Sequence, residues 1–461
     1  MAKRSATKGL IDAPRGGAIP ITTLTEETLP DWLKARGKRL VTWVEQAGFT
    51  GAAGTLCLLP GEDGTLDRVL VGVDWSDGPW ALAHLPGALP AGRYRLDPAP
   101  KAAAATQAAL GWALAHYRFD RYTKAKAPDA ALVWPKGADR AWVAHAAAAT
   151  ALVRDLINTP AGDMGPAELA AAARALARTH KARVSVITGD ALLKKGYPAV
   201  HAVGRASSRA PRLIDLRWGS RGPRVTLVGK GVCFDSGGLD LKSAAGMKLM
   251  KKDMGGSAQV LGIASMVMAG RLPVRLRVLV PAVENSVSGN AFRPLDVLQT
   301  RKGLTVEVGN TDAEGRLILC DALAEADREK PDLLIDFATL TGAARVALGT
   351  DLPALFCNDD AMAEALLAHG LAQHDPLWRM PLHRPYRRLL DSKVADINNI
   401  SDGAFGGAIT AALFLKEFVG DCRWAHVDTM GWSDNPQPGR PAGGEVLGVR
   451  ALFGMLSERY G

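Results

Sequence analysis

The sequence predicts an α/β protein of two domains, with a largely parallel sheet flanked by helices in the larger, C-terminal domain. The chain has 461 residues, which is enough for two or three domains of roughly 150 residues each. After residue 160 the pattern becomes regular, and helical segments alternate with apolar strand-like segments. Such alternation is typical of a mostly parallel sheet that is covered on both faces.

The N-terminal third predicts a smaller α/β domain over residues 1–137. It mixes short strand-like runs (GTLCLLP, RVLVGVDW) with helical stretches such as LPDWLKARGKRLVTWVEQ. The alanine-rich stretch ADRAWVAHAAAATALVRDLINTP, residues 138–160, predicts one long helix ending near Pro160. We expect this helix to connect the N-terminal domain to a second domain over residues 161–461.

Within the second domain the predicted elements follow one another in a clear order. The expected helices are PAELAAAARALARTH, SAQVLGIASMVMAG and ILCDALAEADREK, and the expected strands are VSVIT, PRVTLVG, VRLRVLVPAV and DLLIDFATL. In sheets of this kind, sites form at the carboxyl ends of the strands. The polar residues directly after these strands are therefore the candidates for chemistry.

Composition and charge exclude several classes of protein. The 48% hydrophobic content is ordinary for a globular protein, and no run approaches the roughly 18 apolar residues of a membrane span. The basic N-terminus, MAKRSATKGLIDAPRGG, is followed by no apolar stretch or small-residue cleavage site. Five scattered cysteines without a CxxC pair favour a reducing, cytoplasmic location. The net charge of +9 is spread along the chain, so a solvated basic surface is favoured over nucleic-acid binding.

Three separate loops bring acids and lysines to strand or helix ends. The stretch GKGVCFDSGGLDLK follows a predicted strand, KKDMGGSAQV precedes a predicted helix, and GNTDAEGRL follows the strand-like run LTVEV. Acids gathered from distant loops are how a metal site with oxygen ligands is assembled. The residues concerned are Lys230, Asp235, Lys242, Asp253, Asp312 and Glu314.

Each of these residues also has a structural interpretation. Thr311 and Glu314 have the spacing of a helix capping box, Asp253 could cap the helix that follows it, and Asp235 before Ser-Gly-Gly could form an Asx turn. The sequence gives little support for nucleotide binding, because it contains no GxxxxGK[ST] motif. The absence of HExxH or paired histidines argues against a histidine-based zinc site, so a structural role is favoured for His426.

Arg316 fits a structural role poorly. If a helix begins near Thr311, Arg316 lies in its first turns, where the helix dipole disfavours a cation by at most about 1 kcal/mol. An arginine at this position makes better sense if it holds an anion together with nearby backbone N–H groups.

These motifs together resemble the leucyl (cytosol) aminopeptidase family of two-metal peptidases. VGKGVCFDSGG, the lysine after LDL, MKLMKKDMGG, NTDAEGRL and DFATLTGA occur in this order, and LINTPAGDMGP and LDSKVADINNI are further matches. The resemblance covers roughly residues 140–461, and the N-terminal third matches in length and position only. It implies that residues 161–461 form a catalytic metallopeptidase domain.

The resemblance also implies a role for individual residues. Two divalent metal ions, Mn²⁺ or Zn²⁺ with Mg²⁺ as a further candidate, would share the carboxylates of Asp235 and Glu314. One site would add Lys230, as a neutral amine, and Asp253, and the more exchangeable site would add Asp312. Lys242 would stabilise the oxyanion, and Arg316 would hold a bicarbonate ion that acts as general base. Substrate-binding positions would be Met250, Thr339, Leu340, Gly342 and Met430.

The expected activity is removal of N-terminal residues from peptides by a water activated between the two metals. By resemblance the protein would be a cytoplasmic homohexamer. The chain reads HVDTMG where the family has His-Leu-Asp-Ile-Ala-Gly, so Met430 replaces a small alanine. This departure predicts a reshaped, shallower pocket without a preference for leucine. The alternative function is a DNA-binding or architectural protein on an aminopeptidase scaffold, and steeply salt-dependent binding would favour it.

Overall fold

The computed structural model describes residues 7–124 and 126–461. The first six residues of the basic N-terminal segment therefore lie outside the described residues. The chain forms two compact units, one made of the described residues up to Ala151 with Asn435–Pro441, the other of Leu152–Asp434 with Ala442–Gly461. The expected long helix is α5, Arg140–Asn158. The division into residues 1–137, 138–160 and 161–461 stays a prediction.

The first unit contains a six-stranded sheet in the order β1-β6-β5-β2-β4-β3. Only the pairing of β3 with β4 is antiparallel. The strands are β1 (Leu10–Ile11), β2 (Ile19–Leu24), β3 (Leu56–Pro60), β4 (Leu66–Gly72), β5 (Gly92–Leu96) and β6 (Ala130–Val133). The apolar faces of the sheet and of α4 (Ala102–Ala115) share a core around Val69, Tyr94 and Trp112.

One helix prediction in this unit is wrong in detail. The stretch LPDWLKARGKRLVTWVEQ forms two helices, α1 (Leu29–Lys34) and α2 (Lys38–Gln46). Gly37 lies between them in an extended conformation, with φ −69° and ψ 152°, and acts as the N-cap of α2. An extended residue cannot continue a helix, so the chain breaks where the sequence places its glycine.

The second unit is built on a nine-stranded mixed sheet that is mostly parallel, as predicted. Its order is β16-β15-β18-β14-β9-β11-β8-β7, with β10 paired to β11. The strands are β7 (Arg183–Thr188), β8 (Arg212–Trp218), β9 (Arg224–Gly229), β10 (Gly231–Asp235), β11 (Arg275–Asn285), β14 (Leu333–Ala338), β15 (Ala354–Cys357), β16 (Trp378–Arg379) and β18 (Trp424–Asp428). The central strands β9, β11, β14 and β18 run parallel. Their side chains are buried almost throughout, which explains their continuous apolar sequences.

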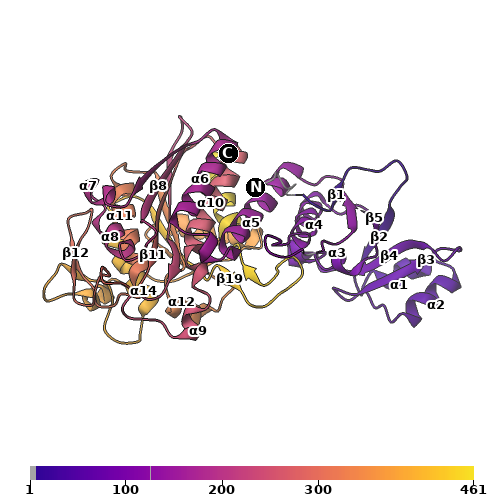
Figure 1. Ribbon diagram of the computed structural model, residues 1–461. Coiled ribbons are helices and arrows are strands. Elements are labelled where there is room, and N and C mark those ends of the chain that lie inside the picture. The colour runs from indigo at the N-terminus through magenta and orange to yellow at the C-terminus, as the bar shows by residue number, and fades with distance from the viewer. Residues whose placement is uncertain (1–6, 125) are drawn as a thin grey trace. The chain divides into compact units, whose positions relative to one another are not determined.

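Helices cover both faces of this sheet (Figure 1). One face carries α6 (Pro166–His180), α10 (Gly255–Ala269), α13 (Asp360–Ala372) and α15 (Val449–Tyr460). The other face carries α8 (Pro198–Gly204), α11 (Glu314–Asp327) and α14 (Gly407–Lys416). Helix α10 approaches β14 so closely that a Cβ at Gly256 would lie 2.1 Å from the carbonyl oxygen of Phe337. Glycine at this position therefore sets the distance between helix and sheet.

The remaining described elements are short. They include α3 (Leu85–Ala88), α7 (Ala191–Lys194), α9 (Ala244–Met247), α12 (Gly342–Leu348) and a 3-10 turn, η3 (Met250–Met254). Strands β12 (Val297–Gln299), β13 (Thr305–Glu307) and β17 (Ile397–Asn398) form a small sheet, and β19 (Trp432–Ser433) pairs with β20 (Gly443–Gly444). Further 3-10 turns are η1 (Trp75–Trp80), η2 (Ala161–Asp163) and η4 (Arg384–Leu390).

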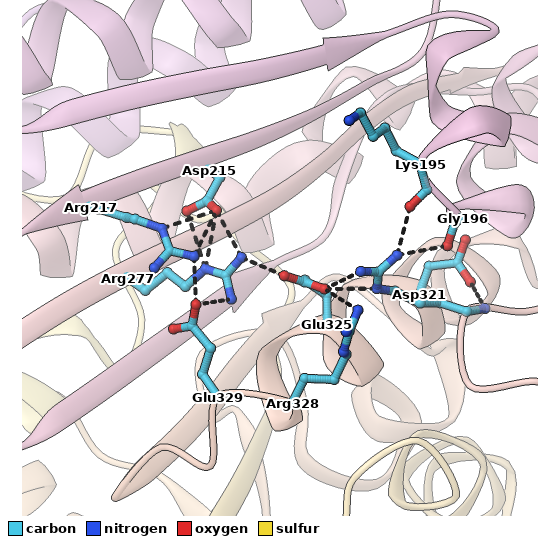
Figure 2. Close-up of polar contacts among 10 residues, drawn as sticks. Lys195, Gly196, Asp215, Arg217, Arg277, Asp321, Glu325, Arg328 and Glu329 are labelled. Carbon is cyan, nitrogen blue, oxygen red and sulfur yellow. Dashed lines mark hydrogen bonds and ion pairs between the residues drawn. The ribbon is translucent and has the colours of Figure 1, made fainter.

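An ionic network joins the sheet to α11 at the amino ends of the parallel strands (Figure 2). Arg277 of β11 donates to Asp215 of β8 and to Glu325 of α11, with both nitrogen–oxygen distances 2.8 Å. It also lies 3.2 Å from Glu329, and Arg301 donates to Glu325 from the other side. Arg277 is 6% exposed, so these carboxylates balance a buried charge.

Among the described helices, none has the length and the apolar character that crossing a membrane requires. All five cysteines are free, and Cys233 is fully buried. His426 is buried as well, with Nδ1 2.6 Å from Asp336 on the neighbouring strand and its ring stacked on Trp424. These contacts agree with the structural role predicted for His426.

Candidate metal centre

The three loops singled out in the sequence meet at the carboxyl ends of β9, β10 and β14. Lys230 directly follows β9, and Asp235 is the last residue of β10. Asp253 lies in η3, and Glu314 is the first residue of α11. Because parallel strands bring their carboxyl ends to one edge of the sheet, residues far apart in sequence come together there.

Lys230 is surrounded by acidic side chains. Its Nζ lies 2.8 Å from Oδ2 of Asp253 and 3.0 Å from Oε1 of Glu314, and it donates to the carbonyl oxygen of Thr339. A Cβ at Gly315 would lie 2.5 Å from Cε of Lys230. The glycine of the motif NTDAEGRL therefore makes room for the lysine against the start of α11.

Lys242 joins the other two acids. Its Nζ lies 2.9 Å from Oδ2 of Asp235 and also pairs with Asp312. Asp235, Asp312 and Glu314 each offer a ligand oxygen, and these three oxygens lie within 4.8 Å of one another. Such convergence of carboxylate oxygens from three chain segments is the geometry of a cation site.

The electrostatics of this cluster favour bound cations. Burial raises the pKa of Glu314 well above its usual value, and the charges of Asp235 and Asp253 add to the effect. Burial, with the charge of Asp253, raises the pKa of Asp235 to about 6. Burial alone would lower the pKa of Lys230, but the nearby carboxylates outweigh it and raise that pKa. The cluster therefore has more negative charge than its two lysines stabilise, and hard divalent cations suit its oxygen ligands.

The proposed capping roles of Thr311 and Asp253 are wrong. Helix α11 begins at Glu314, its N-cap is Ala313, and no side chain caps it. The Thr311 hydroxyl instead donates to the carbonyl oxygen of Gly237 and accepts from the backbone N–H of Asp240, so it joins two loops of the site. Helix α10 begins at Gly255 without a side-chain cap, and the Asp253 carboxylate pairs with Lys230.

For Asp235 the structural and chemical interpretations are compatible. Its Oδ1 accepts from the backbone N–H of Gly237, which is the predicted Asx turn, and from Nδ2 of Asn285. Its Oδ2 faces Lys242. One carboxylate oxygen is therefore used to hold the loop, and the other points into the site.

Arg316 lies in the first turn of α11 and is 8% exposed. Its Nη1 donates to the carbonyl oxygen of Asn399, whereas its buried Nε has no hydrogen-bond partner in the described structure. Burial lowers the pKa of Arg316 to about 10, which leaves the guanidinium charged at neutral pH. A buried arginine with a free N–H beside a cavity has the donor chemistry to bind a small anion.

A cavity of about 400 Å³ collects these side chains. Every site residue predicted from the sequence lines it except Glu314 and Met430. Met430 lines an adjoining cavity of about 390 Å³ together with Met250. The Thr339 hydroxyl donates to Oδ1 of Asp253, so this side chain orients a candidate ligand. The backbone at Leu340 and Gly342 forms part of the cavity wall.

Sequence reasoning missed several polar residues around the site. Asn285 donates to both Asp235 and the carbonyl oxygen of Thr311, and Asp428 accepts from the backbone N–H of Leu340. Both are the last residue of a strand. The rule that polar residues at the carboxyl ends of strands are site candidates therefore applies to them as well. Lys252 and Arg345 also line both cavities. Arg345 lies in the last turn of the short helix α12.

Two family models match the chain. The family model for the catalytic domain of the cytosol aminopeptidase family matches residues 151–453, and the M17 aminopeptidase N-terminal domain matches residues 19–135. A probable cytosol aminopeptidase from Roseiflexus castenholzii is 44% identical over 313 residues. This match covers 67% of the chain and 64% of the relative's length.

Two solved structures extend the similarity over nearly the whole chain. Cytosol aminopeptidase from Coxiella burnetii is 49% identical with a TM-score of 0.94, covering 98% of this chain and 99% of that one. The bottromycin maturation enzyme BotP, solved in complex with Mn, is 35% identical with a TM-score of 0.86, covering 96% and 99%.

Fold and site thus define a peptidase of the two-domain M17 type. The chain belongs to the cytosol aminopeptidase family, as the resemblance of its motifs predicted. None of the descriptions of these family models and relatives mentions nucleic acid, so the comparisons do not support the DNA-binding alternative.

Proposed function

We propose that this protein is a metal-dependent aminopeptidase that removes N-terminal residues from peptides. The observation that carries the proposal is the convergence of Asp235, Asp312 and Glu314 beside the buried pair of Lys230 and Asp253. Membership of the cytosol aminopeptidase family supports the same activity.

In this proposal the five residues Lys230, Asp235, Asp253, Asp312 and Glu314 would hold two divalent cations, and Asp235 and Glu314 would contribute to both. When bound, such a pair polarises a peptide carbonyl, lowers the pKa of a water molecule and anchors the free α-amino group. Lys230 would bind through a neutral amine, so metal binding must displace its proton. The buried carboxylates hold the centre in position, and the neighbouring loops fix their orientation.

Lys242 and Arg316 would supply the protein's own catalytic groups. The Lys242 ammonium lies between Asp235 and Asp312 and lines the cavity, so it can stabilise an oxyanion that develops there. Arg316 would hold bicarbonate through its free N–H, and that anion would take the proton of the attacking water. Met250, Thr339, Leu340, Gly342 and Met430 would position the substrate.

Metal identity, assembly and location are part of the same proposal. Oxygen-rich sites accept Mn²⁺, Zn²⁺ and Mg²⁺, and the complex of BotP with Mn supports manganese. We propose a cytoplasmic homohexamer, in line with the names of the relatives and the family resemblance. Light scattering on the purified protein would give the mass of the assembly directly.

The decisive experiment is an N-terminal hydrolysis assay before and after chelation. We expect release of the first residue from a peptide with a free N-terminus and no release from its acetylated form. Chelation should abolish hydrolysis, and Mn²⁺ should restore it. Hydrolysis that is unaffected by complete metal removal would contradict the proposal.

Variants assign the activity to this site. Asp312→Asn, Glu314→Gln and Lys242→Ala should each lose most activity while staying folded by circular dichroism. Glu364→Gln is a matched control, because Glu364 lies exposed on α13 away from the cavity. Wild-type turnover in any of the three site variants would contradict the role given to that residue.

A further inference from the structure

Two cationic side chains beside the candidate metal centre are not used by the proposed chemistry. Lys252 of η3 and Arg345 of α12 line both the 400 Å³ cavity and the adjoining 390 Å³ cavity. Lys252 is 3% exposed and Arg345 is partly buried. Both side chains therefore form part of the cavity walls, Lys252 from a buried position and Arg345 from a half-buried one.

Neither cation has an acidic partner. Among residues 7–124 and 126–461, no carboxylate oxygen lies within 4.0 Å of either side chain's nitrogens. Arg345 Nη1 contacts the Sδ of Met430 at 3.3 Å, and thioether sulfur is a weak acceptor. A buried cation without an ion-pair partner destabilises the fold, so Lys252, with the half-buried Arg345 in the same cavity, indicates a function in binding.

The acids nearest these cations are already engaged. Asp253 pairs with Lys230 and accepts from Thr339. Asp428 accepts from the backbone N–H of Leu340 and from the hydroxyl of Thr341. Asp312, which lines both cavities, pairs with Lys242. Asp253 and Asp428 therefore act on Lys252 only from beyond ion-pair distance, and a direct ion-pair partner is left for a ligand to supply.

The rest of the adjoining cavity fits the side chain of an amino acid. Met250 and Met430 are apolar parts of the cavity wall, and each is less than a tenth exposed. Methylene groups of a bound side chain could pack on them while a carboxylate reaches the cations. A purely apolar side chain would leave both cations desolvated and unpaired.

We propose that this cavity receives the side chain of the substrate's first residue and selects glutamate or aspartate through Lys252 and Arg345. The inference rests on the proposed aminopeptidase function and deepens it. A second source of the same chemistry is the C-terminal carboxylate of a very short peptide, and the test separates the two sources.

The test compares a substrate that carries the γ-carboxylate of glutamate with one that carries its uncharged amide, glutamine. For α-glutamyl and glutaminyl p-nitroanilides the kcat/KM ratio is measured on one preparation, so metal occupancy cancels. These substrates have no C-terminal carboxylate. We expect the glutamyl substrate to be preferred by roughly tenfold to a hundredfold, the usual effect of charge-assisted hydrogen bonds. Leucyl and alanyl anilides should be poorer than the glutamyl one.

The carboxylate selectivity is tested with variants of Arg345. Lys252 is not used, because it adjoins the candidate metal ligand Asp253. Arg345→Met should bring the glutamyl-to-glutaminyl ratio close to one and improve the leucyl anilide. Arg345→Lys should keep a ratio clearly above one. Arg178→Met, on the exposed surface of α6, is the matched control and should leave the ratio unchanged.

Three results would overturn the inference. The first is a leucyl preference that Arg345→Met does not change. The second is a glutamyl-to-glutaminyl ratio near one for the anilides, together with a preference for dialanine over dialanine amide. That pattern would show that the cavity recognises the C-terminal carboxylate of a short peptide. If the metal-loaded wild type cleaves no substrate, the proposed aminopeptidase function fails. The selectivity of the cavity is then tested by the binding of free glutamate. A thermal shift with glutamate but not glutamine, lost in Arg345→Met, supports it, and the absence of that shift is the third overturning result.

Discussion

The ammonium nitrogen of Lys230 lies 2.8 Å from Oδ2 of Asp253, and both side chains are only 4% exposed. Oε1 of Glu314 lies 3.0 Å from the same nitrogen. Lys230 therefore balances two buried acids in the metal-free protein, and its position depends on the start of α11 and on η3 together. A residue proposed as a metal ligand is at the same time an ionic link within the fold.

The first prediction concerns this link. Lys230→Met should lower the free energy of unfolding of the metal-free protein by about 3–5 kcal/mol, because it leaves buried acids without their cation. Chemical denaturation in the presence of a chelator measures the effect. Lys248→Met, at an exposed lysine in a nearby segment, should change stability by no more than about 0.5 kcal/mol. Equal stability of the two variants would contradict the ionic role of Lys230.

The second prediction concerns Asn285, which positions a candidate ligand without binding metal itself. Its Nδ2 donates to Asp235 at 2.9 Å and to the carbonyl oxygen of Thr311 at 3.1 Å. Asn285→Ala should weaken metal affinity or activity by roughly 10- to 100-fold, the usual effect of removing such a support. Mn²⁺ titration by calorimetry gives the affinity. Unchanged affinity together with unchanged turnover would show that Asp235 does not need this support.

The third prediction concerns Arg316. If it holds a general base, wild-type kcat should rise when bicarbonate is added to carbonate-depleted buffer. Arg316→Met should lower kcat by about 10²–10⁴-fold, the range for general-base catalysis, and should no longer respond to bicarbonate. Arg316→Lys should respond weakly, since lysine lacks the forked donor geometry. A bicarbonate response that survives in Arg316→Met would place the anion elsewhere.

The fourth prediction concerns the ionic network at the opposite end of the sheet (Figure 2). Arg277→Met should destabilise the fold by about 3–5 kcal/mol, because Asp215 and Glu325 lose their shared partner. Arg328→Met is the matched control, since that side chain is 70% exposed and lies 3.7 Å from Glu325; its effect should stay below about 1 kcal/mol. Thermal denaturation at neutral pH compares them, and similar losses would contradict the network's role.

The same network predicts a pH dependence. Burial would raise the pKa of Glu325, but Arg277 and Arg301 outweigh it, so the folded-state pKa is lowered. The stability that this carboxylate contributes is complete above its unfolded pKa of roughly 4.3 and is lost as pH falls through the lower folded value. Glu325→Gln should therefore reduce the acid-induced loss of stability, measured by urea denaturation between pH 6 and pH 3. An unchanged slope against pH would contradict this assignment.

The sequence could predict the sheet and the place of the site because both depend on local patterns. Buried parallel strands have continuous apolar sequences, and polar residues that follow them must lie at one edge of the sheet. The wrong capping role of Thr311 has a different cause. Its hydroxyl finds partners in the 236–242 loop, some 70 residues away in sequence, and no local pattern reveals a contact of that range.

No local sequence pattern reveals a cation that has no acidic partner in the folded chain. Among residues 7–124 and 126–461, no acid forms an ion pair with Lys252 or Arg345, and this follows from the arrangement of the surrounding elements and not from the local sequence. The break between α1 and α2 is easier to predict, because the sequence itself shows Gly37 at that position. The apolar periodicity on either side of it is continuous enough to hide the interruption.

In the proposed site, five residues from three loops would hold two metal ions, and Asp235 and Glu314 would contribute to both. Anomalous diffraction from crystals grown with Mn²⁺ tests it most directly. Two anomalous peaks per chain are expected, both within coordinating distance of Asp235 and Glu314, with Lys230 and Asp253 at one and Asp312 at the other. A hydrolytically active crystal form with one peak, or with peaks remote from these residues, would contradict the account.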